Sequence, residues 1–261
     1  MKILLLGDPH GSGKVKDAPF DGVDLILIPG DVGKADLMRK YAFQHIGKQK
    51  SWTHYESPQL VKRAYCEAYS SSISLLKFLS KKAPVYFVYG NVESSDIETK
   101  KLARRLGISL PLFGESLKRM KNLQPVNNQK VEVQGISLAG LKYFVETDWV
   151  RRFAPDDRRK MKAAEKETFK ARKFLEKLPY VDILLCHQPP YRILDKVTAK
   201  FAPKHWQGKH AGSKLILSYI NRRHPKYVVC GHIHEGKGEV SIGKTKVINA
   251  GVAGDYKIIE C

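Results

Sequence analysis

Seven polar side chains that follow short apolar runs in the sequence are of the types that bind metal ions. They are Asp8, His10, Asp31, Asn91, His187, His232 and His234. Two carboxylates, one amide and four imidazoles, with no thiolate, suit borderline divalent metals such as Mn, Fe, Zn, Co or Ni. Seven ligands are too many for one ion. If one aspartate bridges, they divide into two sites of about four protein ligands each, as a two-metal hydrolase requires.

Taken singly, each of these residues has an ordinary explanation. Asp31, in the segment PGDVG, has the surroundings of a turn residue or a helix cap. His187 stands before two prolines, as a loop histidine would, and Asn91 after a glycine is typical of a turn. Their order and their shared position at the ends of apolar runs favour the metal site.

Five apolar runs precede these residues, and each is typical of a buried strand because it combines four to six apolar residues with an abrupt polar stop. The runs lie at residues 2–6, 23–28, 84–89, 181–186 and 226–230. In an open α/β sheet the loops beyond the carboxyl ends of the strands converge on one crevice. We therefore expect the seven side chains to gather. Alternating segments after Lys130 and from Lys237 to the last residue predict antiparallel strands, with a hairpin turn at Gly243.

Helical patterns occupy the stretches between the strands. Ser57 and Pro58 are typical of an N-cap and a first helical position, and that helix is predicted to reach the lysines before Pro84. A second helix is predicted to start near Pro155, with two aspartates in its first turn and an apolar stripe that ends at Leu178. The sequence thus predicts an α/β fold with one domain over 1–261 and helical insertions at about 36–82 and 142–178.

The composition narrows the classes of partner. Lys and Arg number 46 against 26 Asp and Glu, a formal charge of +20 that favours anionic ligands such as phosphate esters or nucleic acid. The four cysteines show no CxxC spacing, which indicates a reducing compartment. No apolar stretch approaches 18 residues. We expect a cytoplasmic protein without a membrane partner.

The blocks GDPHG, GDVG, GNVE, CHQPP and GHIHEG, in this order from Gly7 onwards, resemble those of the calcineurin-like metallophosphoesterase family. The resemblance implies a β-sandwich flanked by helices, in α/β/β/α layers. It also implies a dinuclear centre, with manganese expected before Fe, Zn, Co or Ni, and hydrolysis of phosphate esters by a metal-bridging hydroxide. By this resemblance one metal is held by Asp8, His10 and His234, the other by Asn91, His187 and His232, and Asp31 bridges them.

One residue departs from the family's pattern. The third block is commonly GNH followed by an acid, whereas here Val92 stands at the histidine's position and cannot donate a proton. A phosphodiesterase is therefore expected before a monoesterase. His210, or alternatively His205, is a candidate acid, and the ordinary alternative is that both are surface-loop histidines. Substrate contacts are expected from Asn91, His187, His210 and the helix start at Ser213.

Two alternatives stay open on the sequence alone. The charge of +20 and the basic insertions favour a metal-dependent nuclease acting on a nucleic-acid partner. The Val92 substitution is the one feature in favour of a non-catalytic scaffold on the same fold, and the intact ligand set argues against it. The sequence does not indicate the oligomeric state.

Overall fold

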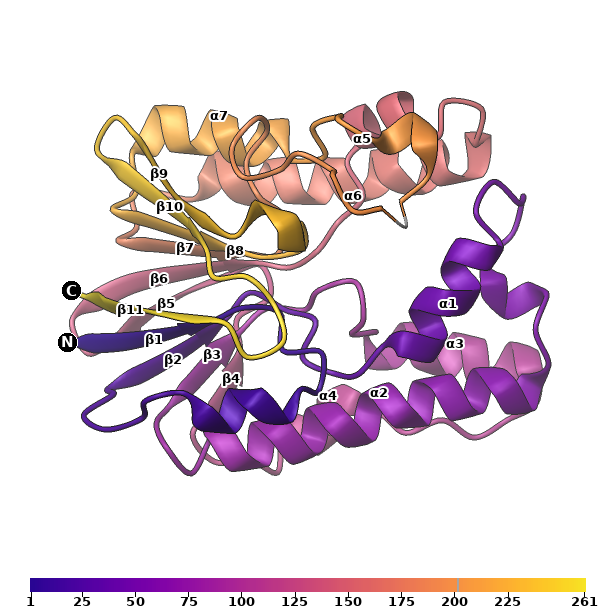
Figure 1. The fold of residues 1–261 in the computed structure, drawn as a ribbon, viewed down its shortest axis with the longest axis horizontal. Helices are drawn as coiled ribbons and strands as arrows, with labels where there is room; N and C mark the ends of the chain where they lie inside the picture. Colours follow the sequence, from indigo (N-terminus) through magenta and orange to yellow (C-terminus); the bar gives the residue numbers. More distant parts are fainter. Residues whose placement is uncertain (201) are drawn as a thin grey trace.

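Two mixed β-sheets form the centre of the protein, and helices cover their outer faces (Figure 1). The computed structural model describes residues 1–200 and 202–261. The first sheet has the order β11-β1-β2-β3-β4 and the second the order β5-β6-β7-β8-β10-β9. The mixed α/β layers with flanking helices that the sequence indicated are therefore present.

The first sheet is parallel except for its edge strand β11, which runs antiparallel to β1. Its strands are β1 (Lys2–Leu6), β2 (Leu25–Ile28), β3 (Val85–Phe87), β4 (Leu123–Pro125) and β11 (Tyr256–Glu260). Alternate residues of β1 face opposite ways, as the period of a strand requires. Ile3 and Leu5 pack between the two sheets, whereas Leu4 and Leu6 pack on the helix side, so all four are buried.

The second sheet combines a parallel centre with two antiparallel edges. Its strands are β5 (Gln129–Val133), β6 (Ile136–Leu141), β7 (Ile183–Cys186), β8 (Tyr227–Cys230), β9 (Gly238–Ile242) and β10 (Thr245–Asn249). The turn between β9 and β10 contains Gly243 with a φ of 56°, which confirms the predicted hairpin.

Helices cover both outer faces of this sandwich (Figure 1). The α-helices are α1 (Asp36–Gln44), α2 (Pro58–Leu79), α3 (Asp96–Leu106), α4 (Phe113–Leu117), α5 (Thr147–Phe153), α6 (Arg158–Lys177) and α7 (Lys214–Arg223). Short 3-10 turns are η1 (Gly13–Asp17), η2 (Trp52–His54), η3 (Lys204–Trp206) and η4 (His234–Gly236). Leu76 of α2 packs on the first sheet, and Leu175 of α6 packs with Ile216 of α7 on the second.

The predicted start of helix α2 is confirmed, and the predicted start of helix α6 is wrong. Ser57 caps α2 by accepting a hydrogen bond from the Leu60 amide, as predicted. Helix α6 does not start near Pro155. It begins at Arg158, because the side chain of Asp157 accepts a hydrogen bond from the Lys160 amide and caps the helix from outside its first turn.

The strands that precede the seven polar residues do not belong to one sheet, contrary to the expectation of a single open sheet. β1, β2 and β3 lie in the first sheet, and β7 and β8 lie in the second. The loops nevertheless converge because both sheets direct the carboxyl ends of these strands to the same end of the sandwich (Figure 1). Among the described residues, no helix is long and apolar enough to cross a bilayer, and the four cysteines are free thiols.

Candidate metal centre

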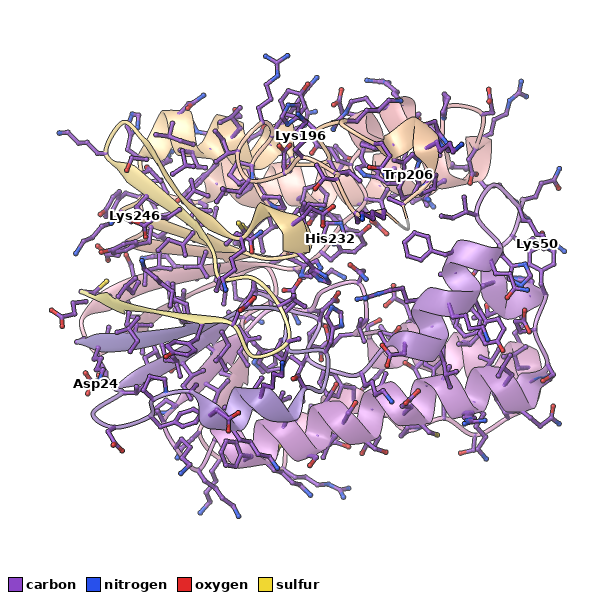
Figure 2. The ribbon with its side chains drawn as sticks, viewed as in Figure 1. Asp24, Lys50, Lys196, Trp206, His232 and Lys246 are labelled. Carbon is purple, nitrogen blue, oxygen red and sulfur yellow. The ribbon has the colours of Figure 1, made fainter. Side chains whose placement is uncertain are left out.

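The structure brings all seven predicted side chains together where the two sheets meet. The first sheet contributes Asp8, His10, Asp31 and Asn91, and the second contributes His187, His232 and His234. Every one of the seven has a polar atom within 3.9 Å of another member. Figure 2 shows His232 at the edge of the space between the two halves of the molecule.

Asp8, His10 and His234 form one group whose ligand atoms all lie within 4.8 Å of one another. The Nε2 atoms of His10 and His234 are 3.2 Å apart, and His234 Nε2 is 3.4 Å from Asp8 Oδ2. Asp31 Oδ2 is 3.7 Å from His10 Nε2 and so lies at the border of this group. Two imidazole nitrogens and carboxylate oxygens at this spacing are suited to bind a divalent metal ion.

Asn91, His187 and His232 form a second group beside Asp31. Asn91 Oδ1 is 3.1 Å from His187 Nε2 and 2.9 Å from His232 Nδ1. Asp31 Oδ1 is 3.7 Å from His187 Nε2, so the two oxygens of Asp31 face different groups. This arrangement is the one that a bridging carboxylate needs.

Asp8, Asp31 and His187 also have ligand atoms that all lie within 4.8 Å of one another. The 3.9 Å approach joins Asp8 Oδ1 to His187 Nδ1, and that nitrogen is 3.0 Å from the carbonyl oxygen of Pro29. Nδ1–H donates to this carbonyl, which leaves His187 Nε2 as the acceptor atom directed at Asn91 and Asp31. Asp31 is thus a better placed bridge than Asp8.

Unpartnered buried atoms test whether these residues fit metal ions. Asp8 Oδ1 and His10 Nδ1 are buried without a hydrogen-bond partner among the described residues. Burial, together with the carboxylates of Asp8 and Glu93, raises the pKa of Asp31. A buried carboxylate oxygen without a donor, and two carboxylates crowded together, lack positive charge that divalent cations would supply.

Three of the four histidines are in the protonation state that metal binding needs. Burial lowers the pKa of His10, His187 and His232 to about 3. Their imidazoles are therefore neutral at pH 7, and a neutral ring nitrogen is the form that coordinates a metal ion. The donor set and its charge state both fit two divalent cations.

The backbone is strained at three of these positions. His10, Asp31 and His232 have φ values of 45°, 47° and 66°, in the left-handed region that non-glycine residues seldom adopt. Such strain costs about 1–3 kcal/mol per residue and persists at functional sites where surrounding structure enforces it. Gly231 allows the close approach, because a Cβ there would lie 2.0 Å from Asp8 Oδ1.

Three further residues hold or border the centre, and sequence reasoning did not find them. The Glu93 carboxylate accepts hydrogen bonds from the backbone amides of Asp31, Val32 and Gly90 at 2.8–3.0 Å. Glu93 is thereby a positioning residue for the loops after β2 and β3. Its position as the acidic residue of the block GNVE was the sequence feature that could have identified it.

Arg39 and Tyr143 are the other two, and no motif marks them. Arg39, on α1, donates a hydrogen bond from Nη2 to His10 Nε2 at 3.0 Å. The ring of Tyr143, after β6, lies edge-on to His187 with centroids 5.6 Å apart and tilted against His232 at 5.3 Å. Both residues lie in the predicted insertions, for which the sequence indicated no role at the metal centre.

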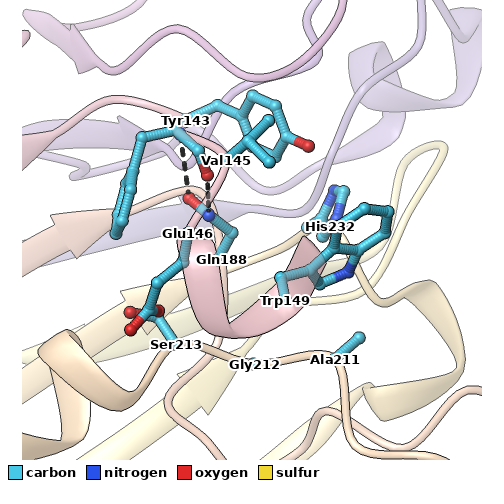
Figure 3. A pocket seen from close by; sticks show the side chains of 10 residues that line it. Tyr143, Val145, Glu146, Trp149, Gln188, Ala211, Gly212, Ser213 and His232 are labelled. Atoms are coloured by element: carbon cyan, nitrogen blue, oxygen red, sulfur yellow. Dashed lines mark hydrogen bonds between the residues drawn. The ribbon is translucent and has the colours of Figure 1, made fainter. Parts of the chain in front are cut away.

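Ser213 lines a small pocket together with His232, whereas the described contacts of the candidate acid His210 are with residues outside the seven ligand side chains. His210 Nδ1 is 2.6 Å from Asp195 Oδ1, and its side chain is 36% exposed. Ser213 is buried and caps α7 by accepting a hydrogen bond from the Ile216 amide. Figure 3 shows Ser213 and Gly212 in a small pocket that His232 also lines. Their roles in catalysis stay predictions.

Comparison with known proteins identifies the family. The sequence model of calcineurin-like phosphoesterases (Metallophos) matches residues 1–236. The chain belongs to the calcineurin-like phosphoesterase family. The predicted family resemblance is confirmed, and the sandwich with its polar end is the fold of that family.

Solved structures agree with this fold. One aligns with 99% of this chain and 94% of its own, with a TM-score of 0.63 and 15% identity. TT1561 of Thermus thermophilus aligns with 97% of this chain and 90% of its own, with a TM-score of 0.50 and 17% identity. At these identities the likeness to each neighbour is one of fold.

A curated relative matches over a shorter stretch. Metallophosphoesterase domain-containing protein 1 of Homo sapiens is 42% identical over 73 residues, which are 28% of this chain and 20% of that relative. The match thus spans about a fifth of the relative's length.

Proposed function

We propose that this chain is a metal-dependent phosphodiesterase whose active centre holds two divalent cations, manganese first among the candidates. The observation that supports the proposal most strongly is the set of seven ligand side chains from two sheets, with Asp8 Oδ1 buried and unpartnered among them. We also propose that residues 1–261 fold as one domain around this centre, with 36–82 and 142–178 as its insertions.

The chain's own residues have separate tasks in this proposal. Cations held by these residues would supply positive charge and Lewis acidity for attack on phosphorus. Asp31 lies between the two ligand groups, and the Val92 amide donates to its Oδ1 at 2.8 Å, which fixes the carboxylate plane. The His232 amide donates to Asp8 Oδ2 at 2.6 Å. These backbone contacts preorganise the ligands before substrate arrives.

Arg39 supplies the cationic group that the third block lacks in this proposal. Val92 packs against Ala35, Ala68 and Met38 and offers no proton donor. Arg39 lies on α1, and its guanidinium donates a hydrogen bond to His10 Nε2 at the centre. A guanidinium there would bind a phosphate oxygen and stabilise charge that develops during attack. It does not replace an acid that protonates the leaving alcohol, so esters with good leaving groups are favoured.

The lack of a proton donor at Val92 supports substrates with good leaving groups, and among these we propose diesters before monoesters. A phosphomonoester dianion with a poor leaving group depends on proton donation, and neither Val92 nor a guanidinium supplies it. His210 remains the candidate acid, paired with Asp195. We therefore place phosphodiesters with acidic leaving alcohols before monoesters as substrates.

The Asp31→Asn variant tests this proposal. In the presence of manganese, hydrolysis of bis(nitrophenyl) phosphate is expected to fall by at least about 100-fold, because the carboxylate shared by both groups is lost. Asp36→Asn is the matched control, since the Asp36 side chain is 71% exposed on α1. Activity of Asp31→Asn within threefold of the wild type, with an unchanged circular dichroism spectrum, contradicts the bridging role.

The same preparation separates the two alternatives. Cleavage of RNA or DNA by the wild type and not by Asp31→Asn would favour the nuclease, with the charge of +20 drawing the polymer to the protein. A protein that binds no transition metal and hydrolyses no ester with any added would instead be the scaffold.

A further inference from the structure

A cavity of about 480 Å³ opens directly from the candidate metal centre. Its inner end is lined by Asp31, Asn91, His232 and His234. Cavities of roughly 300–1,000 Å³ are the size of small-molecule sites. Whatever occupies this one lies against the groups proposed to bind the phosphate.

The walls of the cavity are aromatic. The chain has three tryptophans, and all of them line it. On one wall Trp149 stacks on Phe153 at a centroid distance of 5.0 Å and meets Trp206 edge-on at 5.6 Å. On the other wall Trp52 stacks on Tyr65 at 6.4 Å. The rings support one another within each wall, so both walls are preformed.

Segments outside the two sheets build these walls. Met38 and Ile46 come from α1 and the turn after it, Trp149 from α5, and Val197 from the segment between β7 and α7. Figure 2 shows Trp206 on the side of α5 and α6, across the open space from α1. The predicted insertion 36–82 therefore faces the insertion 142–178 and the segment between β7 and α7 across the cavity, and apolar side chains of all three line it.

Positive charge is scarce in this cavity although it is abundant elsewhere. Of the 46 Lys and Arg residues, the described lining contains Arg39 and Lys160. Arg39 is directed at His10, and Lys160 Nζ lies 4.7 Å from the centre of the Trp149 ring. A channel for a polynucleotide needs a row of cations along the phosphates, and these walls do not provide one.

We propose that the substrate carries a large apolar group, aliphatic or aromatic, on its phosphate, and that this group binds in the cavity between the two insertions. The proposal rests on the proposed function, which places the phosphate at the inner end. Water in an aromatic cavity makes few hydrogen bonds, so its displacement by an apolar group is favourable. The arrangement fits such a molecule: its anionic head would lie at the end where the proposed cations bind, and its uncharged body would lie between the aromatic walls.

Non-hydrolysable phosphonates test the proposal through binding. Methylphosphonate, octylphosphonate and phenylbutylphosphonate are titrated into the manganese-loaded protein, and tryptophan fluorescence reports on the cavity because all three tryptophans line it. At least one of the two long phosphonates is expected to bind about 30-fold more tightly than methylphosphonate. This is a conservative expectation, since each buried methylene contributes nearly fourfold. The octyl and phenylbutyl probes distinguish an aliphatic from an aromatic preference.

Variants at one exposed wall position locate the binding. Ile46 lines the cavity and is 37% exposed, so Ile46→Glu places a charge beside the apolar group without burying it in the core. We expect the affinity ratio of the preferred long phosphonate to methylphosphonate to fall at least fivefold. Ile46→Trp, which fills the cavity, is expected to lower it as well. Ile97→Glu is the matched control, because Ile97 is 68% exposed on α3 and lies outside the lining.

The outcomes separate this proposal from the proposed function. Equal affinities for all three phosphonates, in a protein that hydrolyses diesters, would overturn the apolar cavity and leave the phosphodiesterase intact. Thymidine monophosphate binding as tightly as the long phosphonates would overturn it too, in favour of a nucleotide. Tight binding of octylphosphonate by a protein that hydrolyses no ester would support the cavity and contradict the enzyme.

Discussion

At the scale of single residues, the sequence predicts most of the candidate ligands, but it does not predict every residue that contacts them. Asp8, Asp31 and the four histidines were predictable because ligand-type residues recur after apolar runs. Arg39 was not, because an arginine on a charged helix is ordinarily solvated. Only the fold of α1 brings its Nη2 to within 3.0 Å of His10 Nε2.

Arg39→Ala is expected to lower kcat/KM for a phosphodiester by about 10- to 100-fold, because a cationic donor for the phosphate is lost. Arg39→Lys should recover only part of this, since an ammonium cannot form two parallel hydrogen bonds to a phosphate. Steady-state kinetics with bis(nitrophenyl) phosphate provide the measurement. Lys40→Ala, next along the helix and exposed, is the control. Wild-type kinetics for Arg39→Ala would remove Arg39 from the active centre.

Glu93→Ala is expected to lower the free energy of unfolding by about 2–5 kcal/mol, because three backbone amides lose their acceptor. Urea denaturation measures the loss. Glu93→Gln keeps one acceptor oxygen and should lose less. Glu115→Gln, at a side chain that is 53% exposed, is the control. If Glu93→Ala unfolds at the wild-type urea concentration, these three bonds do not hold the loops.

At the scale of strands, helices and loops, the sequence predicted strands far better than loop conformations. The runs at β1, β2, β7 and β8 are buried strands as expected, since continuous apolar runs suit a sheet covered on both faces. Which sheet each strand joins depends on pairing between distant segments, and local sequence does not encode it. Helix α6 begins later than predicted, because Asp157 caps the helix and does not lie in its first turn.

The loop after β8 depends on a glycine. Gly231→Ala is expected to weaken manganese binding by about 10- to 100-fold, because a Cβ 2.0 Å from Asp8 Oδ1 must displace that carboxylate. Isothermal titration calorimetry measures the affinity. Gly13→Ala is the matched control, since a Cβ there meets no atom within 4 Å. An unchanged affinity for Gly231→Ala would show that Asp8 does not need its observed position.

At the scale of the whole molecule, two sheets each contribute part of the candidate centre, so we expect ion binding to be coupled to folding. In the proposed centre, a cation held by Asp31 and His187 would tie the two halves of the sandwich together. The net charge of +20 comes from residues spread over the whole sequence. Of the described Lys and Arg residues, Arg39 and Lys160 line the cavity, so most of this charge lies outside it.

Metal removal should therefore destabilise the entire fold. Manganese at 100 times its dissociation constant stabilises a protein by about 2.7 kcal/mol, which for a chain of this length raises the thermal midpoint by about 5 °C. Differential scanning calorimetry before and after chelation measures the shift. The Asp31→Asn variant should shift less, and a midpoint that chelation leaves unchanged would contradict the coupling.

The number of manganese ions bound per chain tests the central claim most directly. Equilibrium dialysis followed by elemental analysis is expected to give two ions for the wild type. Asn91→Ala, which removes a ligand of the second group alone, is expected to give a value closer to one. A wild-type protein that binds one ion, or none, at saturating manganese would contradict a dinuclear centre built from these seven side chains.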